Sequence, residues 1–96
     1  MAPLHIDLQD GFADDLVVVR VNGTEVFRKE GVTTSLLLSY ADSLQTQISG
    51  WPAKVETIVQ SRNLSKTIRV RESYLGIAIQ EGEINYVERG EPFGYL

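Results

Sequence analysis

Residues 16–27 read LVVVRVNGTEVF, and this stretch decides the fold class. Two runs rich in β-branched residues flank Asn22-Gly23, the dipeptide that best fits a two-residue type I′ turn. With that turn at the tip, we expect four cross-strand pairs: Val21/Thr24, Arg20/Glu25, Val19/Val26 and Val18/Phe27. The stretch therefore predicts a β-hairpin whose two faces are chemically matched.

Further strands follow on both sides of this hairpin. Residues 74–80 and 83–88 flank Glu81-Gly82 and predict a second hairpin, with Ile79 opposite Ile84 and Ile77 opposite Tyr86. Residues 54–60 and 66–72 alternate apolar and polar side chains and predict a third hairpin, joined by a loop over residues 61–65. Near the start, Leu4, Ile6 and Leu8 alternate with polar residues, which predicts a first strand that ends at Asp10-Gly11.

Residues 33–50 admit two interpretations. Four apolar residues have the spacing of an amphipathic helix, with Gly50 after its end: Leu37, Ala41, Leu44 and Ile48. A strand through residues 44–48, after a short apolar segment at 35–38 and a turn at 40–43, fits equally well. We favour the strand, because 23 of the 96 residues are Val, Ile or Thr. A short helix within 34–49 is the alternative.

The composition is that of one small globular domain spanning residues 1–96. The chain has 43% hydrophobic and 23% charged residues and no cysteine, so neither disulfides nor the usual zinc ligand sets are expected. We therefore predict an all-β fold: a small antiparallel β-sandwich of seven or eight strands, immunoglobulin-like in general shape. No apolar run has the length of a membrane span and no leader pattern is present, so residence in the cytoplasm is the default expectation.

The net charge of −4 argues against binding to nucleic acid or to an anionic membrane surface. The charge is unevenly spread along the chain. Residues 1–15 carry the whole excess, residues 54–71 are basic, and residues 72–96 are acidic. If the basic and acidic segments form neighbouring strands, their charges compensate each other across the strands.

The richest cluster of polar chemistry is an acidic run near the start, formed by Asp7, Asp10, Asp14 and Asp15. Hard cations such as Ca²⁺ prefer several oxygen ligands from one loop, and paired carboxylates can also serve acid/base catalysis. The spacing matches no known metal loop, and Asp and Gly are equally the residues of turns. A calcium site and a small enzyme built on this run are therefore secondary hypotheses, and no cofactor is expected.

Arg69 and Arg71 are two apart on a predicted strand, so they share a face that could bind a carboxylate or phosphate. Pairing with the glutamate-rich C-terminal hairpin is the simpler account. Trp51 and Tyr40 lie in predicted turns, where exposed rings stack on sugars or anchor protein partners. A ring that plugs one end of the core is the commoner role. The single histidine, His5, is predicted to lie on the exposed side of the first strand.

These features predict a non-enzymatic binding or assembly module. Its partner is expected to be a protein, either a second copy or another chain, bound through loops, edge strands or the apolar segment 91–96. The alternative is a carbohydrate-binding module that uses Trp51 and Tyr40 on a glycan.

Overall fold

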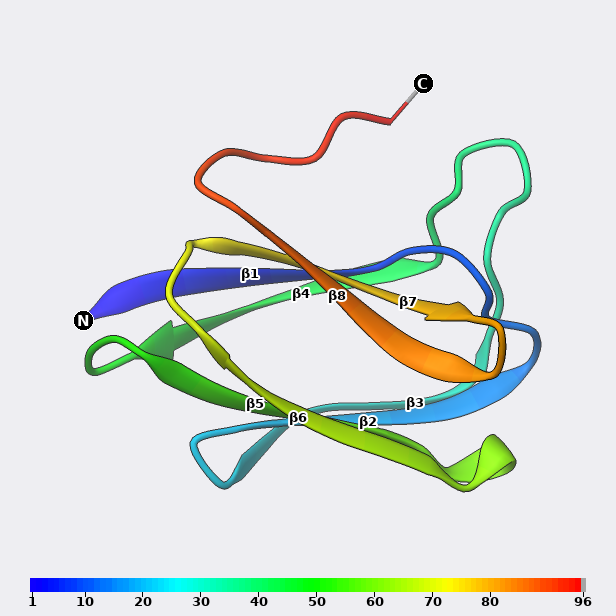
Figure 1. Ribbon diagram of the computed structural model, residues 1–96, viewed down its shortest axis with the longest axis horizontal. Coiled ribbons are helices and arrows are strands. Elements are labelled where there is room, and N and C mark those ends of the chain that lie inside the picture. Colours follow the sequence, from blue (N-terminus) through cyan, green and yellow to red (C-terminus); the bar gives the residue numbers. More distant parts are fainter. Residues whose placement is uncertain (96) are drawn as a thin grey trace.

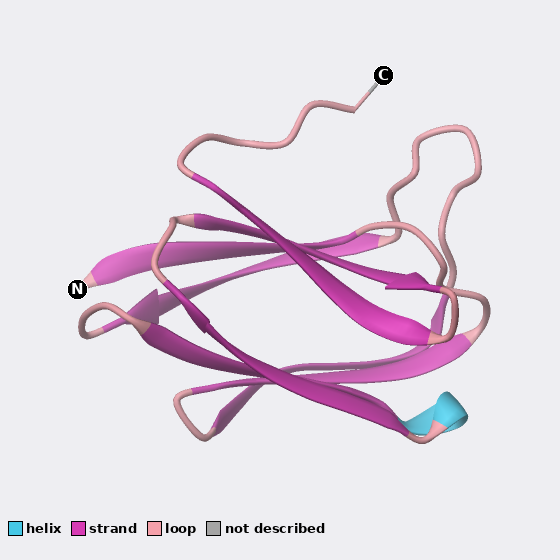
Figure 2. Ribbon diagram, viewed as in Figure 1, coloured by secondary structure: helices cyan, strands magenta, loops and turns pink. Residues whose placement is uncertain are grey.

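The computed structural model describes residues 1–95 as two β-sheets packed face to face (Figure 1). The eight strands are β1 (Ala2–Leu8), β2 (Asp15–Val21), β3 (Thr24–Val32), β4 (Asp42–Ile48), β5 (Ala53–Val59), β6 (Leu64–Val70), β7 (Tyr74–Gln80) and β8 (Glu83–Arg89). A single turn of 3₁₀ helix, η1 (Gln60–Arg62), joins β5 to β6 and is the one helical segment in Figure 2. Over residues 1–95, no helix is long and apolar enough to cross a membrane.

The all-β prediction and the number of strands are confirmed. Sheet A has the order β4-β1-β7-β8 and sheet B has the order β3-β2-β5-β6. Alternate residues of each strand point into the space between the sheets, as the period of two requires. The fully buried side chains come from both sheets, and the largest are Leu4, Ile6, Leu8, Leu75 and Ile77 of sheet A and Val17, Val19, Val55, Val59 and Val70 of sheet B.

The prediction of a wholly antiparallel sandwich is wrong for one strand pair. β1 runs antiparallel to β4 but parallel to β7, so sheet A is mixed. β7 enters sheet A after the chain has crossed over from β6 of sheet B, and a crossing between sheets leaves the two neighbours free to run in the same direction. A local alternation pattern carries no information about this choice.

The hairpin registers agree with the sequence except at one irregularity. In the first hairpin, Val21 pairs with Thr24 and Arg20 with Glu25, as expected. Beyond a register shift, Val19 pairs with Phe27 instead of Val26, and Val18 pairs with Arg28 instead of Phe27. The extra residue on β3 is the signature of a β-bulge.

The C-terminal hairpin has the predicted pairs Ile79/Ile84 and Ile77/Tyr86. The third predicted hairpin is β5 and β6, whose register runs from Ala53/Val70 to Val59/Leu64.

Residues 33–50 contain no helix, so the alternative of a short helix within 34–49 is wrong. β4 begins at Asp42, two residues before the predicted start, and residues 36–39 form a turn outside both sheets. β4 instead pairs with β1 over seven residues, and a helix of this length would be only marginally stable without tertiary packing of its own.

The expected charge compensation between the basic and acidic segments is also wrong as a pairing of neighbouring strands. The basic strand β6 pairs only with β5 in sheet B, whereas β7 and β8 lie in sheet A. β6 and β8 instead meet across the open side of the sandwich, where Lys66 Nζ donates to the Ile84 carbonyl oxygen at 3.1 Å. The Tyr86 hydroxyl bridges Thr57 Oγ1 and the Lys66 carbonyl oxygen, each at 2.9 Å.

Candidate functional site

The turn between β3 and β4 projects beyond the end of the sandwich (Figure 1). It carries Leu36 and Leu37, whose exposed fractions of 95% and 87% are far above those of ordinary leucines in a folded domain. We call this turn, residues 35–40, the apolar tip. Exposure of two adjacent leucines to water is unfavourable in free energy, and these side chains add nothing to the hydrophobic core.

Hydrogen bonds hold the apolar tip in one shape. Ser35 N donates to the Tyr40 carbonyl oxygen at 2.9 Å, and Ser39 N donates to the Ser35 carbonyl oxygen at 2.8 Å. Leu38 N donates to Ser35 Oγ at 3.4 Å, and Ser39 takes a positive φ of 56° to close the turn. Leu36 and Leu37 are therefore exposed on a turn whose backbone has a defined conformation.

The base of the apolar tip is fixed to the loop between β1 and β2. Thr34 exchanges two hydrogen bonds with Phe12, and the Thr34 hydroxyl donates to the Gln9 carbonyl oxygen at 2.5 Å. Ala41 N donates to the Leu8 carbonyl oxygen at 2.7 Å. Both ends of the turn are hydrogen-bonded to a buried strand and to the loop that follows it. A partner would therefore bind without the entropic cost of ordering this backbone.

A shallow pocket of about 330 Å³ lies between the apolar tip and the C-terminal segment, residues 90–95. Leu37 and Leu38 line one side, and Gly94 and Tyr95 line the other. The Tyr95 ring lies 5.0 Å from the Tyr40 ring, centroid to centroid, in a tilted arrangement that aromatic pairs favour. The polar residues Gln9, Asp10 and Ser39 complete the lining, so the pocket joins apolar and polar groups between the tip and the outer side of sheet A.

Tyr95 anchors the C-terminal segment on that side of sheet A. Its hydroxyl donates to Asp7 Oδ2 at 2.8 Å and accepts from Gln9 Nε2 at 2.9 Å. Burial, the hydrogen bond to Asp7 and its charge together raise the pKa of Tyr95 to about 12, although the bond from Gln9 opposes them. The segment thus docks on its own domain, without forming a strand. Leu96, the end of the predicted apolar segment, lies outside the described residues.

The end of the sandwich that carries the apolar tip is strongly acidic. It comprises the four loops at that end together with two flanking residues of each adjoining strand, and we call it the acidic end. Arg62 is the one basic residue within these bounds, and Lys29, just outside them, reaches Asp42 with its Nζ 2.6 Å from Oδ2. The carboxylates there are Asp7, Asp10, Asp14, Asp15, Asp42, Glu81 and Glu83. The negative excess that the sequence places in residues 1–15 is thus joined in space by carboxylates from two other loops.

One carboxylate of the acidic end is structural. Asp15 is 2% exposed, and its carboxylate accepts from Arg62 Nη2 at 2.9 Å, Arg62 Nε at 3.1 Å, Ala13 N at 2.8 Å and Ser61 Oγ at 2.5 Å. Burial alone raises the pKa of Asp15, but these hydrogen bonds and the Arg62 charge outweigh burial and hold the pKa below its ordinary value. Arg62 also donates to the Gly11 carbonyl oxygen at 2.7 Å and so fixes the neighbouring loop.

The residues of the predicted calcium site do not form one cluster. Asp7 is engaged by Tyr95 and Asp15 by Arg62, while Asp10 and Asp14 lie exposed in the loop between β1 and β2. Within the described part of the chain, no three His, Cys, Asp or Glu side chains gather in a way that could hold a metal ion. The acidic end therefore differs from a cation site in that its carboxylates are dispersed.

Trp51 and Tyr40, the predicted sugar-stacking pair, are separated by the whole length of β4. Tyr40 lies in the apolar tip before the strand, and Trp51 follows its end. Seven strand residues span about 20 Å, so the two rings cannot stack on the same sugar residue. Trp51 is 38% exposed, and its role in glycan binding stays a prediction.

Arg69 and Arg71 do not pair with the glutamates of the C-terminal hairpin. Arg69 lies directly opposite Lys54 across β5 and β6, and neither side chain forms an ion pair with any residue from 1 to 95. Arg71 follows β6, and it is its backbone N–H that donates to Glu88 Oε1 at 2.8 Å. Two like charges in direct opposition form a small positive patch far from the acidic end.

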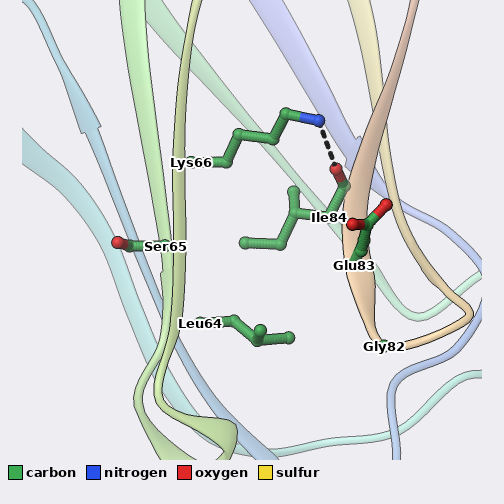
Figure 3. Close-up of a pocket in the computed structure, with 6 residues that line it drawn as sticks. All are labelled: Leu64, Ser65, Lys66, Gly82, Glu83 and Ile84. Carbon is green, nitrogen blue, oxygen red and sulfur yellow. Dashed lines mark hydrogen bonds between the residues drawn. The ribbon is translucent and has the colours of Figure 1, made fainter.

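His5 lies on the outer side of sheet A, as predicted, and its ring stacks on Tyr74 with the centroids 4.5 Å apart. A second pocket of about 350 Å³ opens between the edge strands β6 and β8 (Figure 3). Leu64 and Ile84 point into this space, Lys66 spans it, and Ser65 points away from it. This pocket lies at the side of the core where β6 and β8 are joined by the hydrogen bonds of Lys66 and Tyr86.

The sequence pattern did not single out Leu36 and Leu37 as candidate site residues. In either interpretation of residues 33–50, the run Leu36-Leu37-Leu38 reads as an apolar segment of an element that is buried. The signal that could have indicated the tip is the pair Ser35 and Ser39 around three leucines, since serine is favoured in turns, where its hydroxyl can bond a nearby backbone group as Ser35 Oγ does with Leu38 N.

Comparisons of the chain with models of protein families, with curated proteins and with solved structures found no match.

Proposed function

We propose that this protein is a non-enzymatic protein-binding module that engages its partner through the apolar tip. The observation that carries the proposal is the exposure of Leu36 and Leu37 on a turn held in one shape by its own hydrogen bonds. An ordered, adjacent pair of large apolar side chains at the end of a domain is typical of an interaction site.

The energetics favour a partner that covers more than the two leucines. Burial of one leucine side chain contributes about 1.5–3 kcal/mol, while association costs at least about 4 kcal/mol in lost freedom of motion. The tip alone barely offsets that cost. The rings of Tyr40 and Tyr95 add apolar surface beside the tip, and the polar groups of Gln9, Asp10 and Ser39 in the neighbouring pocket offer hydrogen bonds to a partner.

The surrounding charge supports a protein partner over a lipid one. The tip stands among seven carboxylates, of which Arg62 and Lys29 each pair with one, and anionic lipid headgroups repel the negative charge that remains. The same charge favours a partner whose apolar groove is bordered by basic side chains. The immunoglobulin-like shape remains a prediction, and the proposed function does not depend on it.

A photo-crosslinking residue at position 37 tests the proposal in cells of the native host. We expect a discrete protein adduct, absent when the same residue replaces Thr67 on the outer side of sheet B. The partner in the adduct, once purified, should bind the wild type but not a variant that combines Leu36→Ser with Leu37→Ser. Binding of the wild type to neutral or anionic vesicles, or equal crosslinking at both positions, would contradict the proposal.

A further inference from the structure

The edge of sheet A that β4 forms directs backbone groups away from the sheet. Because His5 N donates to the Ser73 carbonyl oxygen, the odd-numbered residues of β1 point their backbone groups toward β7. The even-numbered residues of β1 therefore bond β4, where their partners are also even-numbered, as in Leu4 opposite Thr46. The residues of β4 whose N–H and C=O groups point away from β1 are then Ser43, Gln45 and Gln47.

Two of these three residues have backbone groups with no strand beside them. Ser43 N donates to Asp42 Oδ1 at 2.8 Å. In the described part of the chain β4 pairs only with β1, so the N–H and C=O groups of Gln45 and Gln47 bond no other strand. Such a row of donors and acceptors is a template for one more strand.

The other three sheet edges carry protection that β4 lacks. In β6, Lys66 lies opposite the buried Thr57, so a charged side chain occupies an inward position at that edge. From residue 43 to residue 48, β4 has no charged residue, no proline and no register shift. The charged residues of the remaining edges are Glu25, Arg28, Lys29 and Glu30 in β3 and Glu83, Glu88 and Arg89 in β8.

A pocket of about 280 Å³ opens beside the β4 edge, between the end of β4 and the start of β3. Val21, Val26 and Ile48 are among the residues that line it, and none of its described side chains is charged. We call it the edge pocket. Its volume exceeds the roughly 150 Å³ of a cavity that accommodates benzene, so one leucine or phenylalanine side chain fits.

The edge pocket lies where a side chain of an added strand would point. Thr46 lines the pocket, and it lies opposite Leu4, which is fully buried, so Thr46 is on the inner face of sheet A. Residues directly opposite each other on neighbouring strands share a face. The residue of an added strand opposite Thr46 would therefore point toward the pocket.

We propose that the β4 edge, residues 43–48, binds an extended, uncharged segment of a partner protein as a fifth strand of sheet A. One bulky apolar side chain of that segment occupies the edge pocket. Main-chain hydrogen bonds to Gln45 and Gln47 align the segment along β4, and the pocket selects the side chain. A charged side chain there would lose hydration beside Val26 and Ile48 without meeting an opposite charge. The edge pocket and the apolar tip lie at opposite ends of β4, so this inference does not depend on the proposed function.

The probe is a phage-displayed library of random peptides of about twelve residues. It is selected against the purified variant that combines Leu36→Ser with Leu37→Ser, so that the apolar tip cannot capture the peptides. We expect the enriched peptides to share one leucine, isoleucine or aromatic residue within an uncharged stretch of about five residues, the length that pairs with β4.

Amide hydrogen exchange followed by NMR locates a synthetic copy of the enriched peptide. In the free protein, the N–H groups of Gln45 and Gln47 should exchange fast, because no strand bonds them. With the peptide bound, their exchange should slow at least about tenfold. The N–H groups of Leu44 and Thr46 already bond β1 and should change little.

Two variants of the same background test the edge and the pocket. Gln45→Pro removes one free N–H without removing a hydrogen bond to β1, and Thr46→Lys gives β4 the inward lysine that β6 has. Each should weaken peptide binding at least about tenfold in calorimetric titration. The matched control Thr67→Lys adds the same charge on the outer side of sheet B and should leave the affinity unchanged. Melting curves report whether each variant folds, and Thr46→Lys decides the matter if Gln45→Pro does not.

A library that enriches no peptide overturns the inference. It is overturned as well by a peptide that protects the amides of β6 or β8, or by one that binds Thr46→Lys as tightly as its parent. Dimers of the wild type in sedimentation velocity, with Gln45 and Gln47 protected in the absence of peptide, would show that a second copy takes the edge and would also overturn it. Crosslinking at position 37 tests the proposed function separately, on a different surface.

Discussion

The network around Asp15 allows one prediction to be worked out in detail. Arg62→Met keeps most of the length of the side chain but removes its charge and the three hydrogen bonds it donates to Asp15 and Gly11. The Asp15 carboxylate, 2% exposed, then retains only Ser61 Oγ and Ala13 N as donors. Breaking a buried pair in this way costs about 3 kcal/mol or more, since an uncompensated charge is left behind.

For a domain of this size, such a loss lowers the melting temperature by about 12–24 °C. The matched control is Arg28→Met, which breaks a pair with Glu25 in which both side chains are well solvated. We expect the control to leave the melting temperature nearly unchanged. Thermal unfolding at pH 7, followed by circular dichroism, measures both variants against the wild type.

The effect of Arg62→Met also depends on pH. In the wild type the pKa of Asp15 is lowered below its ordinary value of 3.8, so its contribution to stability is complete above that pH and is lost as the pH falls below it. Protonation removes the buried charge in the variant as well. The gap in unfolding free energy between the two proteins should therefore narrow toward acid. A gap under about 1 kcal/mol at pH 7, or one that does not change with pH, would refute the assigned role of this pair.

Three further predictions test the fold and the site. Gly11→Ala is expected to lower the free energy of unfolding by about 2–4 kcal/mol, because φ at this position is +91° and the added Cβ would overlap the Ile79 carbonyl oxygen. The control Gly50→Ala, which has open space around it, should change the free energy of unfolding by no more than about 0.5 kcal/mol. Tyr95→Phe should remove the highest tyrosine pKa from an ultraviolet titration, and in the wild type the docking contribution of neutral Tyr95 is present below pH 10 and lost as pH rises through about 12. The tip variant, Leu36→Ser with Leu37→Ser, should melt at the wild-type temperature, and a clear drop would show that the tip packs in the fold.

An element can be predicted from the sequence when the interactions that form it connect residues close together along the chain. Hairpins such as Tyr74–Gln80 with Glu83–Arg89 obey a two-residue turn and alternating side chains, and their register agrees with the sequence pattern. The shift at Val19 depends on how β3 twists against β2 and on what β3 meets at the edge, so the local pattern could not reveal it.

The candidate site was the least predictable part. A run of three leucines is compatible with an inward-facing strand, a helix face or an exposed turn. The sequence pattern gives the order of the apolar residues, but it does not say whether another part of the fold buries them. The exposure of Leu36 and Leu37 follows from the tertiary structure, in which Ser35 and Tyr40 pair to close the turn outside both sheets.

The sequence by itself determined that the chain folds as strands, where the tight turns fall and which side chains of each strand face inward. These properties depend on residues a few positions apart, whose conformational preferences and alternation are local. Only the tertiary structure decided that β1 lies parallel to β7, that carboxylates from three loops gather at one end, and that Lys54 lies directly opposite Arg69 in sheet B. Each of these features brings together segments that are distant in the sequence. Which segments become neighbours depends on which apolar surfaces are buried against each other when the two sheets pack.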